Sequence, residues 1–192
     1  MPVNTSKKPI GKVRIIAGRW RGLMLTVPEA KSLRPTGDRI RETLFNWLQP
    51  YLPGSRCLDL FAGSGVLGFE AVSRGAAKAV LVDNNQLLIQ KLTQDKERLK
   101  AIEVELVCRD ALGYLGEASR EMDIVFLDPP FDTYLMEGAI AMLEQRGWLA
   151  RQALIYLETP ADVERCPFPE SWSILKEKKS GNVVYCLAQR SL

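Results

Sequence analysis

From residue 56 onward, short apolar runs of strand length alternate with longer segments of helical periodicity. Strands are predicted at 56–60, 79–82, 104–107, 123–127 and 153–157, with helices at 66–74, 86–100, 111–119 and 134–145 between them. Parallel strands need a crossover, so this alternation predicts a doubly wound parallel sheet. Two more runs, 172–175 and 183–188, follow with only a short turn between them. The predicted fold is therefore α/β, a mainly parallel seven-stranded Rossmann-like sheet whose last strand is antiparallel.

The first 50 residues do not continue this alternation. Two short strands are predicted there, 13–16 and 23–27, joined by a turn bounded by glycines. Outside this region, one further short helix is predicted near 161–164. Residues 38–48 place apolar side chains on one helical face. The sequence thus predicts a basic N-terminal arm, hairpin and helix at 1–50, and a main domain at 51–192.

Composition narrows the chemistry. The 192 residues include no histidine, which excludes histidine-based triads and imidazole metal ligands. The four cysteines form no Cys-x-x-Cys pair, so neither zinc nor another metal is expected. No apolar run approaches the roughly 18 residues of a membrane span, and the polar start lacks a secretory signal. We therefore expect a cytoplasmic protein without metal or membrane contact.

Positive charge is concentrated at the N-terminus. Residues 1–41 hold ten Lys or Arg side chains against two acidic ones, whereas the remainder holds 16 basic and 21 acidic side chains. Arginines with a tryptophan among them suit phosphate contacts and base stacking. The alternative is a solvated basic face that confers only solubility. The candidate RNA-binding residues are Arg14, Arg19, Trp20, Arg21, Arg34, Arg39 and Arg41.

A glycine-rich loop follows the first strand of the main domain. Gly63, Gly65 and Gly68 have the spacing G-x-G-x-x-G between a strand and a helix, where backbone N–H groups can approach a ligand closely. Asp83 ends the next strand, where a carboxylate can accept hydrogen bonds from both hydroxyls of a ribose. These features fit NAD as well as S-adenosylmethionine, and a purely structural turn is the third reading.

The tetrapeptide Asp128-Pro129-Pro130-Phe131 ends the strand at 123–127. Neither proline has an N–H group, so the strand stops there and leaves oxygen acceptors beside an aromatic ring. Those groups suit a planar base with an exocyclic amine. The alternative is a proline-terminated strand with Phe131 in the core. S-adenosylmethionine carries its own electrophile and needs neither metal nor histidine, so it explains this corner better than NAD does.

With both motifs in place, the chain resembles the class I S-adenosylmethionine-dependent amino-methyltransferases. Segments 14–22 (RIIAGRWRG) and 34–46 (RPTGDRIRETLFN) are similar to those of the bacterial D-type 16S rRNA guanine-N2 methyltransferases. The resemblance extends from about residue 13 to 189. It implies an enzyme whose partner is 16S rRNA within the small ribosomal subunit or a late assembly intermediate, with the target guanine conventionally numbered 966.

The resemblance also implies individual roles. For the cofactor, the backbone of the glycine loop would hold the methionine part, and Asp59 would brace that loop. Asp83 would bind the ribose hydroxyls. Asp110 and the Ala111 N–H group, after the third strand, would lie near the adenine amine. For the target, Asp128 and the Pro129 carbonyl would accept the two amine N–H bonds, and Phe131 would stack on the flipped base. The implied cofactor-binding residues are Asp59, Phe61, Ala62, Gly63, Gly65, Asp83, Asp110, Ala111 and Thr36, with Thr36 and Arg39 near the cofactor or the target nucleotide.

Two other functions remain open on the sequence. A DNA adenine-N6 or cytosine-N4 methyltransferase shares the Pro-Pro corner, but it usually needs a target-recognition segment for which this chain has no obvious room. A non-catalytic RNA-binding assembly factor would share the fold, but the intact glycine loop, Asp83 and Asp128 argue against it.

Overall fold

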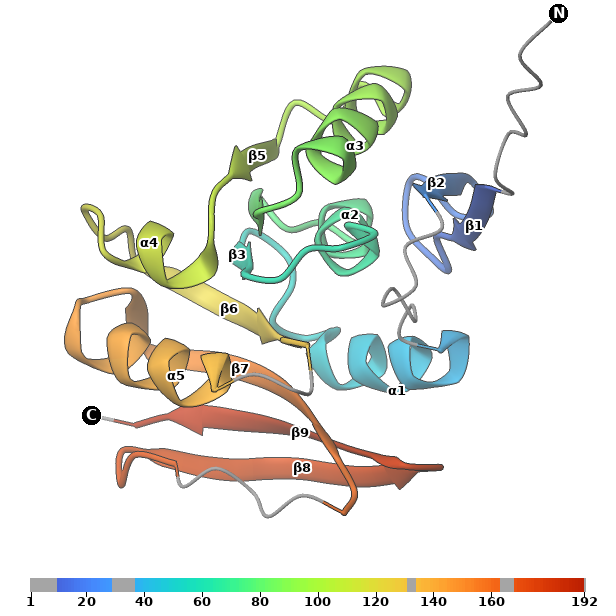
Figure 1. Ribbon diagram of the computed structural model, residues 1–192. Coiled ribbons are helices and arrows are strands. Elements are labelled where there is room, and N and C mark those ends of the chain that lie inside the picture. Colours follow the sequence, from blue (N-terminus) through green and yellow to red (C-terminus); the bar gives the residue numbers. More distant parts are fainter. Residues whose placement is uncertain (1–9, 29–36, 131–133, 163–167, 192) are drawn as a thin grey trace, which may run out of the picture.

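The computed structural model describes residues 10–28, 37–130, 134–162 and 168–191 (Figure 1). The helices are α1 (Asp38–Leu48), α2 (Val66–Ser73), α3 (Gln86–Leu99), α4 (Ala111–Leu115) and α5 (Leu135–Gln145). The strands are β1 (Ile10–Arg14), β2 (Met24–Pro28), β3 (Arg56–Asp59), β4 (Lys78–Asp83), β5 (Val104–Cys108), β6 (Met122–Leu127), β7 (Leu149–Pro160), β8 (Trp172–Ser180) and β9 (Val183–Arg190).

Seven strands form one sheet in the order β5-β4-β3-β6-β7-β9-β8. The pairs from β5 through to β7 are parallel, and β9 runs antiparallel to both β7 and β8. This confirms the predicted mainly parallel sheet with an antiparallel last strand. The chain winds outward from β3 in one direction and from β6 in the other, and such a switch point opens a crevice at the carboxyl ends of the strands.

Helices cover both faces of this sheet (Figure 1). Helices α1, α2 and α3 share one hydrophobic cluster with one face, which includes Leu81, Phe126 and Tyr156. Helices α4 and α5 pack with Trp148 on the other face. Because the central strands are buried on both faces, they read as continuous apolar runs rather than as alternating ones.

The N-terminal hairpin β1–β2 is docked on α2 and α3, and its apolar side chains belong to the same cluster as the sheet. The fully buried Glu70 of α2 accepts hydrogen bonds from the backbone N–H groups of Ile16 (2.7 Å) and Ala17 (2.9 Å). It also accepts one from Arg74 Nε at 2.7 Å. The predicted division at residue 50 stays a prediction, and the hydrophobic core runs across it without interruption.

Element boundaries differ from the predicted ones at several places. Strand β7 spans Leu149–Pro160 rather than 153–157, and β1 spans Ile10–Arg14 rather than 13–16. Helix α4 ends at Leu115 rather than near 119, with Gly116 at its C-cap. Strand β8 continues through its lysines to Ser180, because charged side chains are compatible with an exposed edge strand. Of the short helix predicted near 161–164, Ala161 and Asp162 form a turn, and the rest lies outside the described residues.

Candidate active site

The strand register brings three carboxylates to the same level at the carboxyl edge of the sheet. Asp59 pairs with Leu81 of β4 and with Phe126 of β6, and Phe126 pairs with Tyr156 of β7. Two residues beyond these partners come Asp83, Asp128 and Glu158. Since successive side chains alternate between faces, all three continue the face that α1, α2 and α3 cover. Asp59 lies on the same face, at the level of Leu81 and Phe126, two residues before that of Asp83 and Asp128.

The glycine loop connects β3 to α2 at the switch point of the sheet. Gly65 has φ +71°, and a Cβ at that position would lie 2.5 Å from Leu92 Cδ2. A Cβ on Gly68 would lie 2.5 Å from Leu81 Cδ1. Glycine at these two positions therefore lets α2 pack closely on β4 and α3, which holds the N-terminus of the helix and the loop before it at the sheet edge.

Asp83 braces this loop from the neighbouring strand. Its Oδ2 accepts a hydrogen bond from the Gly63 N–H group at 2.9 Å, and its Oδ1 accepts one from the Asn85 N–H group at 2.8 Å. Partial burial raises the pKa of the Asp83 carboxyl, and the two amide donors oppose that shift. The loop and the predicted ribose-binding carboxylate are thus joined by a direct hydrogen bond.

Asp59 is almost fully buried beneath the loop. Its Oδ2 accepts a hydrogen bond from the Gly68 N–H group at 3.2 Å, in the first turn of α2. Burial raises the pKa of Asp59 to about 7, the Gly68 amide lowers it, and the nearby charge of Asp83 raises it further. Near neutral pH this side chain is therefore close to its own midpoint of titration.

This burial predicts an unusual dependence of stability on pH. Since the native pKa of Asp59 exceeds its unfolded value of 3.8, the native state binds more protons, and the free energy of unfolding falls as pH rises from about 4 to about 7. The amide oxygen of an asparagine can still accept from Gly68, so Asp59→Asn is expected to lose this slope and to gain up to ~4 kcal/mol on the wild type at pH 8. Urea unfolding at pH 5 and pH 8 measures it, and equal slopes in both proteins would refute it.

Asp110 and Ala111 lie at the end of β5, next to β4. Asp110 is the N-cap of α4, and its Oδ1 accepts a hydrogen bond from the Gly113 N–H group at 2.7 Å. Ala111 begins the helix and is buried. The predicted cofactor-binding residues of β3, β4 and β5 therefore follow three adjacent strand ends.

The Asp-Pro-Pro corner lies on the other side of the switch point. Asp128 is half-buried, Pro129 is buried and Pro130 is exposed, directly after β6 ends at Leu127. Phe131, Thr36 and Arg34 lie outside the described residues, so their predicted roles stay predictions.

Two predicted RNA-binding residues are in the core, and for them that prediction was wrong. Trp20 is 7% exposed, with its ring centroid 6.1 Å from that of Phe69. Arg41 is fully buried, and its Nη1 donates to the backbone oxygen of Arg14 at 2.9 Å. Arg41 lies three and four residues before the buried Leu44 and Phe45, a spacing that places it on the buried face of α1.

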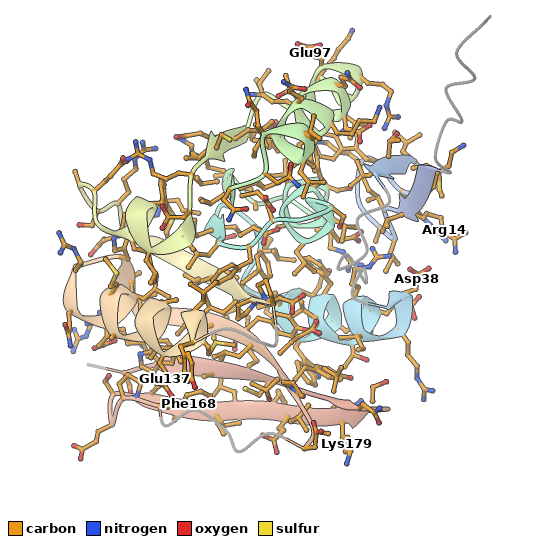
Figure 2. The ribbon with its side chains drawn as sticks, in the orientation of Figure 1. Arg14, Asp38, Glu97, Glu137, Phe168 and Lys179 are labelled. Atoms are coloured by element: carbon orange, nitrogen blue, oxygen red, sulfur yellow. The ribbon has the colours of Figure 1, made fainter. Side chains whose placement is uncertain are left out.

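The other described arginines of the arm remain at the surface. Arg19 makes a bidentate pair with Glu103 at 2.8 and 2.7 Å, and its guanidinium lies 4.2 Å from the Trp20 ring centroid. Arg14 Nη2 lies 3.9 Å from Asp38 Oδ2, on the side of the molecule where the hairpin meets α1 (Figure 2). Arg21 and Arg39 are exposed. Among the described residues of the arm, these four arginines are available to a polyanion, as is the exposed Lys12.

Glu158 is a buried carboxylate at the same edge of the sheet that sequence reasoning missed. It is 5% exposed, and its Oε1 accepts a hydrogen bond from the Tyr156 hydroxyl at 2.5 Å. The available signal was its position, because it follows an apolar strand run just as Asp83 and Asp128 do.

Elsewhere the described residues add nothing to this site. A surface hollow of about 670 Å³ is lined by Lys96, Glu103 and neighbouring residues at the start of β5, at the opposite edge of the sheet. Within the described ranges, no group of three acidic or cysteine side chains is arranged to hold a metal ion. No helix in the described part is long and apolar enough to cross a membrane.

Comparison with known proteins gives consistent relatives. Residues 13–189 match the family described as Conserved hypothetical protein 95. The chain is 47% identical over 180 residues to the Ribosomal RNA small subunit methyltransferase D of Escherichia coli, covering 94% of this chain and 91% of that one. It is 47% identical to the protein of the same name from Haemophilus influenzae, covering 93% and 94%. A solved Escherichia coli structure described as a methyltransferase has a TM-score of 0.89 and 44% identity, covering 95% and 99%.

Proposed function

Because the chain belongs to the family of ribosomal RNA small subunit methyltransferases D, we propose that it transfers a methyl group from S-adenosylmethionine to the 2-amino group of a guanine in 16S rRNA. One observation carries the proposal. A glycine loop braced by Asp83 and a proline-terminated strand end bearing Asp128 lie side by side at the switch point of the sheet.

The residues present fit the cofactor. Asp83 uses one acceptor position of each oxygen for the Gly63 and Asn85 amides, and a carboxylate offers about four such positions. It can therefore accept from ribose hydroxyls without releasing the loop. The backbone from Phe61 to Gly65 would face the methionine part, and Asp110 with Ala111 would lie near the adenine.

Cofactor binding supplies the next prediction. Asp83→Asn is expected to weaken S-adenosylmethionine binding roughly 10–100-fold, because it removes a charged acceptor from both the loop and the ribose. Titration calorimetry measures the change. Glu97→Gln, an exposed change on α3, is the control and should bind like the wild type. Unchanged affinity of Asp83→Asn would remove Asp83 from the proposed site.

The proposed chemistry needs positioning rather than strong acid–base groups. When bound, S-adenosylmethionine supplies a methyl group on a positively charged sulfur. Asp128 and the Pro129 carbonyl would accept the two N–H bonds of the amine and concentrate its lone pair on nitrogen for attack. Asp128 would also be the first acceptor of the proton that the nitrogen loses once it carries the methyl group in place of the cofactor's sulfur. Phe131 would stack on the base.

The proposed substrate is 16S rRNA in the small subunit or a late assembly intermediate. The exposed arginines Arg14, Arg21 and Arg39, with Arg19 beside them, would contact phosphates around the target nucleotide. Such a short basic surface gives little sequence readout, so the folded RNA and ribosomal proteins would contribute to positioning.

The function is tested by labelled methyl transfer to small subunits from a strain that lacks this protein. Naked 16S rRNA and duplex DNA run in parallel, and the products are digested to nucleosides. Label in N2-methylguanosine from the subunits is the expected result. Label only in DNA would replace the proposal with DNA methylation, and cofactor binding without any transfer would contradict an enzymatic role on these substrates.

A further inference from the structure

Glu158 is a buried carboxylate beside the Asp-Pro-Pro corner for which the proposed reaction has so far no use. Burying a carboxylate is costly unless hydrogen bonds compensate it, and Glu158, within β7, accepts one from the Tyr156 hydroxyl. The position of Glu158 in the sheet points to a use beyond packing. Strand β7 lies on the side of β6 that faces away from β3, the glycine loop and Asp83. Glu158 is therefore on the side of the site where the target base would lie.

The register places Glu158 next to Asp128. Leu127 pairs with Leu157 in parallel strands, so the next residue of each segment, Asp128 just beyond β6 and Glu158 within β7, lies at the same level. On its other side Glu158 pairs with Tyr185 of β9. Neighbouring strands are about 4.8 Å apart, close enough for one small planar group to contact both side chains. Burial raises the pKa of the Tyr156 hydroxyl well above its ordinary value, and the charges of both carboxylates raise it further.

Tyr156 fixes the orientation of Glu158. The tyrosine is fully buried between Phe126 and Tyr185, with ring centroids 6.4 Å from each, and its hydroxyl donates to Glu158 Oε1. With its raised pKa, the hydroxyl stays protonated and remains a donor over the physiological range. A carboxylate has about four acceptor positions, so this bond leaves acceptor capacity for a substrate N–H group.

Two adjacent carboxylates suit the Watson–Crick edge of guanine in particular. Guanine presents an N1–H group directly beside its 2-amino group, and both are donors. Adenine and cytosine instead present a ring-nitrogen lone pair beside their amine, and a carboxylate facing that lone pair would be repelled. An extra acceptor next to Asp128 therefore distinguishes guanine from the other bases that carry an exocyclic amine.

We propose that Glu158, held by Tyr156, accepts the N1–H group of the target guanine and thereby restricts the site to guanine. This inference rests on the proposed function, because it names the group that selects the base for that reaction. Asp128 contacts the reacting amine, and Glu158 determines which base can present that amine.

The test changes the Watson–Crick edge of the target base. Small subunits are reconstituted with 16S rRNA carrying either guanine or 2,6-diaminopurine at the target position. Diaminopurine keeps the 2-amino group but has a lone pair at N1 and an amino group in place of the O6 carbonyl. The change at position 6 is the same for every protein variant, so the role of Glu158 is read from the difference in preference between variants. The wild-type protein should prefer guanine by about 100-fold in kcat/KM, since a site built for an N–H donor strongly rejects an analogue without it. In Glu158→Gln the amide can donate to N1 or accept from it, so the preference should fall below about tenfold.

The preference is a ratio measured with one enzyme preparation, so a loss of folded protein does not alter it. Tyr156→Phe, which removes only the hydroxyl that orients Glu158, should lower the preference in the same direction. Glu97→Gln lies far from this edge, at the end of α3 (Figure 2), and should keep the wild-type ratio.

Two results would overturn the inference, and they are distinguishable. If the wild type methylates guanine subunits and Glu158→Gln keeps the 100-fold preference, Glu158 does not read N1–H and the proposed function stands. If the wild type transfers no methyl to guanine subunits, the proposed function fails and the inference falls with it.

Discussion

Asp128→Ala is expected to reduce methyl transfer by at least about 1000-fold while S-adenosylmethionine binding stays within about twofold of the wild type. In the proposed reaction Asp128 contacts only the target amine. Asp128 lies across the switch point from the loop braced by Asp83. Its removal would therefore take away the hydrogen-bond acceptor of the target amine and would leave the cofactor site intact. Single-turnover transfer to small subunits and a cofactor titration measure the two effects.

Asp123→Ala is the matched control for this variant. Asp123 is an aspartate of the same strand, but it lies at the amino end of β6 and pairs with Arg56 at the surface. The variant should lose at most about 1 kcal/mol of stability and keep its transfer rate. If Asp128→Ala retained near-wild-type turnover, the proposed acceptor role of Asp128 would be wrong. If it lost cofactor binding equally, its role would be in the cofactor site.

Glu70→Ala should be the most destabilising of the substitutions considered, with a loss of about 3–5 kcal/mol in the free energy of unfolding. The Glu70 carboxylate is fully buried and accepts from the Ile16 and Ala17 N–H groups and from Arg74, and Arg41 Nη1 is 3.9 Å away. Alanine would leave two buried arginines beside a cavity and the turn of the hairpin without its acceptor. Chemical denaturation measures the loss, and faster amide exchange at Ile16 and Ala17 would localise it.

Glu103→Ala tests whether burial of the carboxylate is the cause of the large loss of stability expected for Glu70→Ala. Its carboxylate pairs with Arg19 of the same hairpin in two short hydrogen bonds, but at the surface. Such a pair should contribute no more than about 1 kcal/mol. If Glu70→Ala cost as little as Glu103→Ala, the hairpin would be held by its apolar contacts and not by Glu70.

The regular elements were accessible from sequence because their signals are local. Helix α1 was predicted with the observed bounds from the spacing of Ile40, Leu44 and Leu48. The parallel direction of the strands followed from the helices that separate successive strands, since a parallel pair cannot be joined by a short turn. The extent of β8 was underestimated, because its lysines resemble a turn unless the strand is known to be at the edge of the sheet.

Burial of Trp20 was not accessible in this way, and burial of Arg41 was accessible only through its helical spacing from Leu44 and Phe45. Trp20 and Arg41 lie in a basic, aromatic-containing segment that is typical of an RNA-binding arm, yet both are buried. The burial of each side chain depends on a partner in α2 that is more than 25 residues away in the chain, Phe69 for Trp20 and Glu70 for Arg41. Composition reports the chemistry of a segment, but it does not report which side of that segment another element will cover.

The sequence by itself determined the fold class, the position of the glycine loop and the ends of the strands that bear Asp83 and Asp128, because periodicity, glycine spacing and proline act within a few residues. Only the tertiary structure decided which strand ends are neighbours. Glu158 is 30 residues from Asp128 in the chain, and it adjoins that residue only because β7 pairs with β6 in the observed register. Pairing between distant strands depends on the packing of the whole sheet, and no local pattern encodes it.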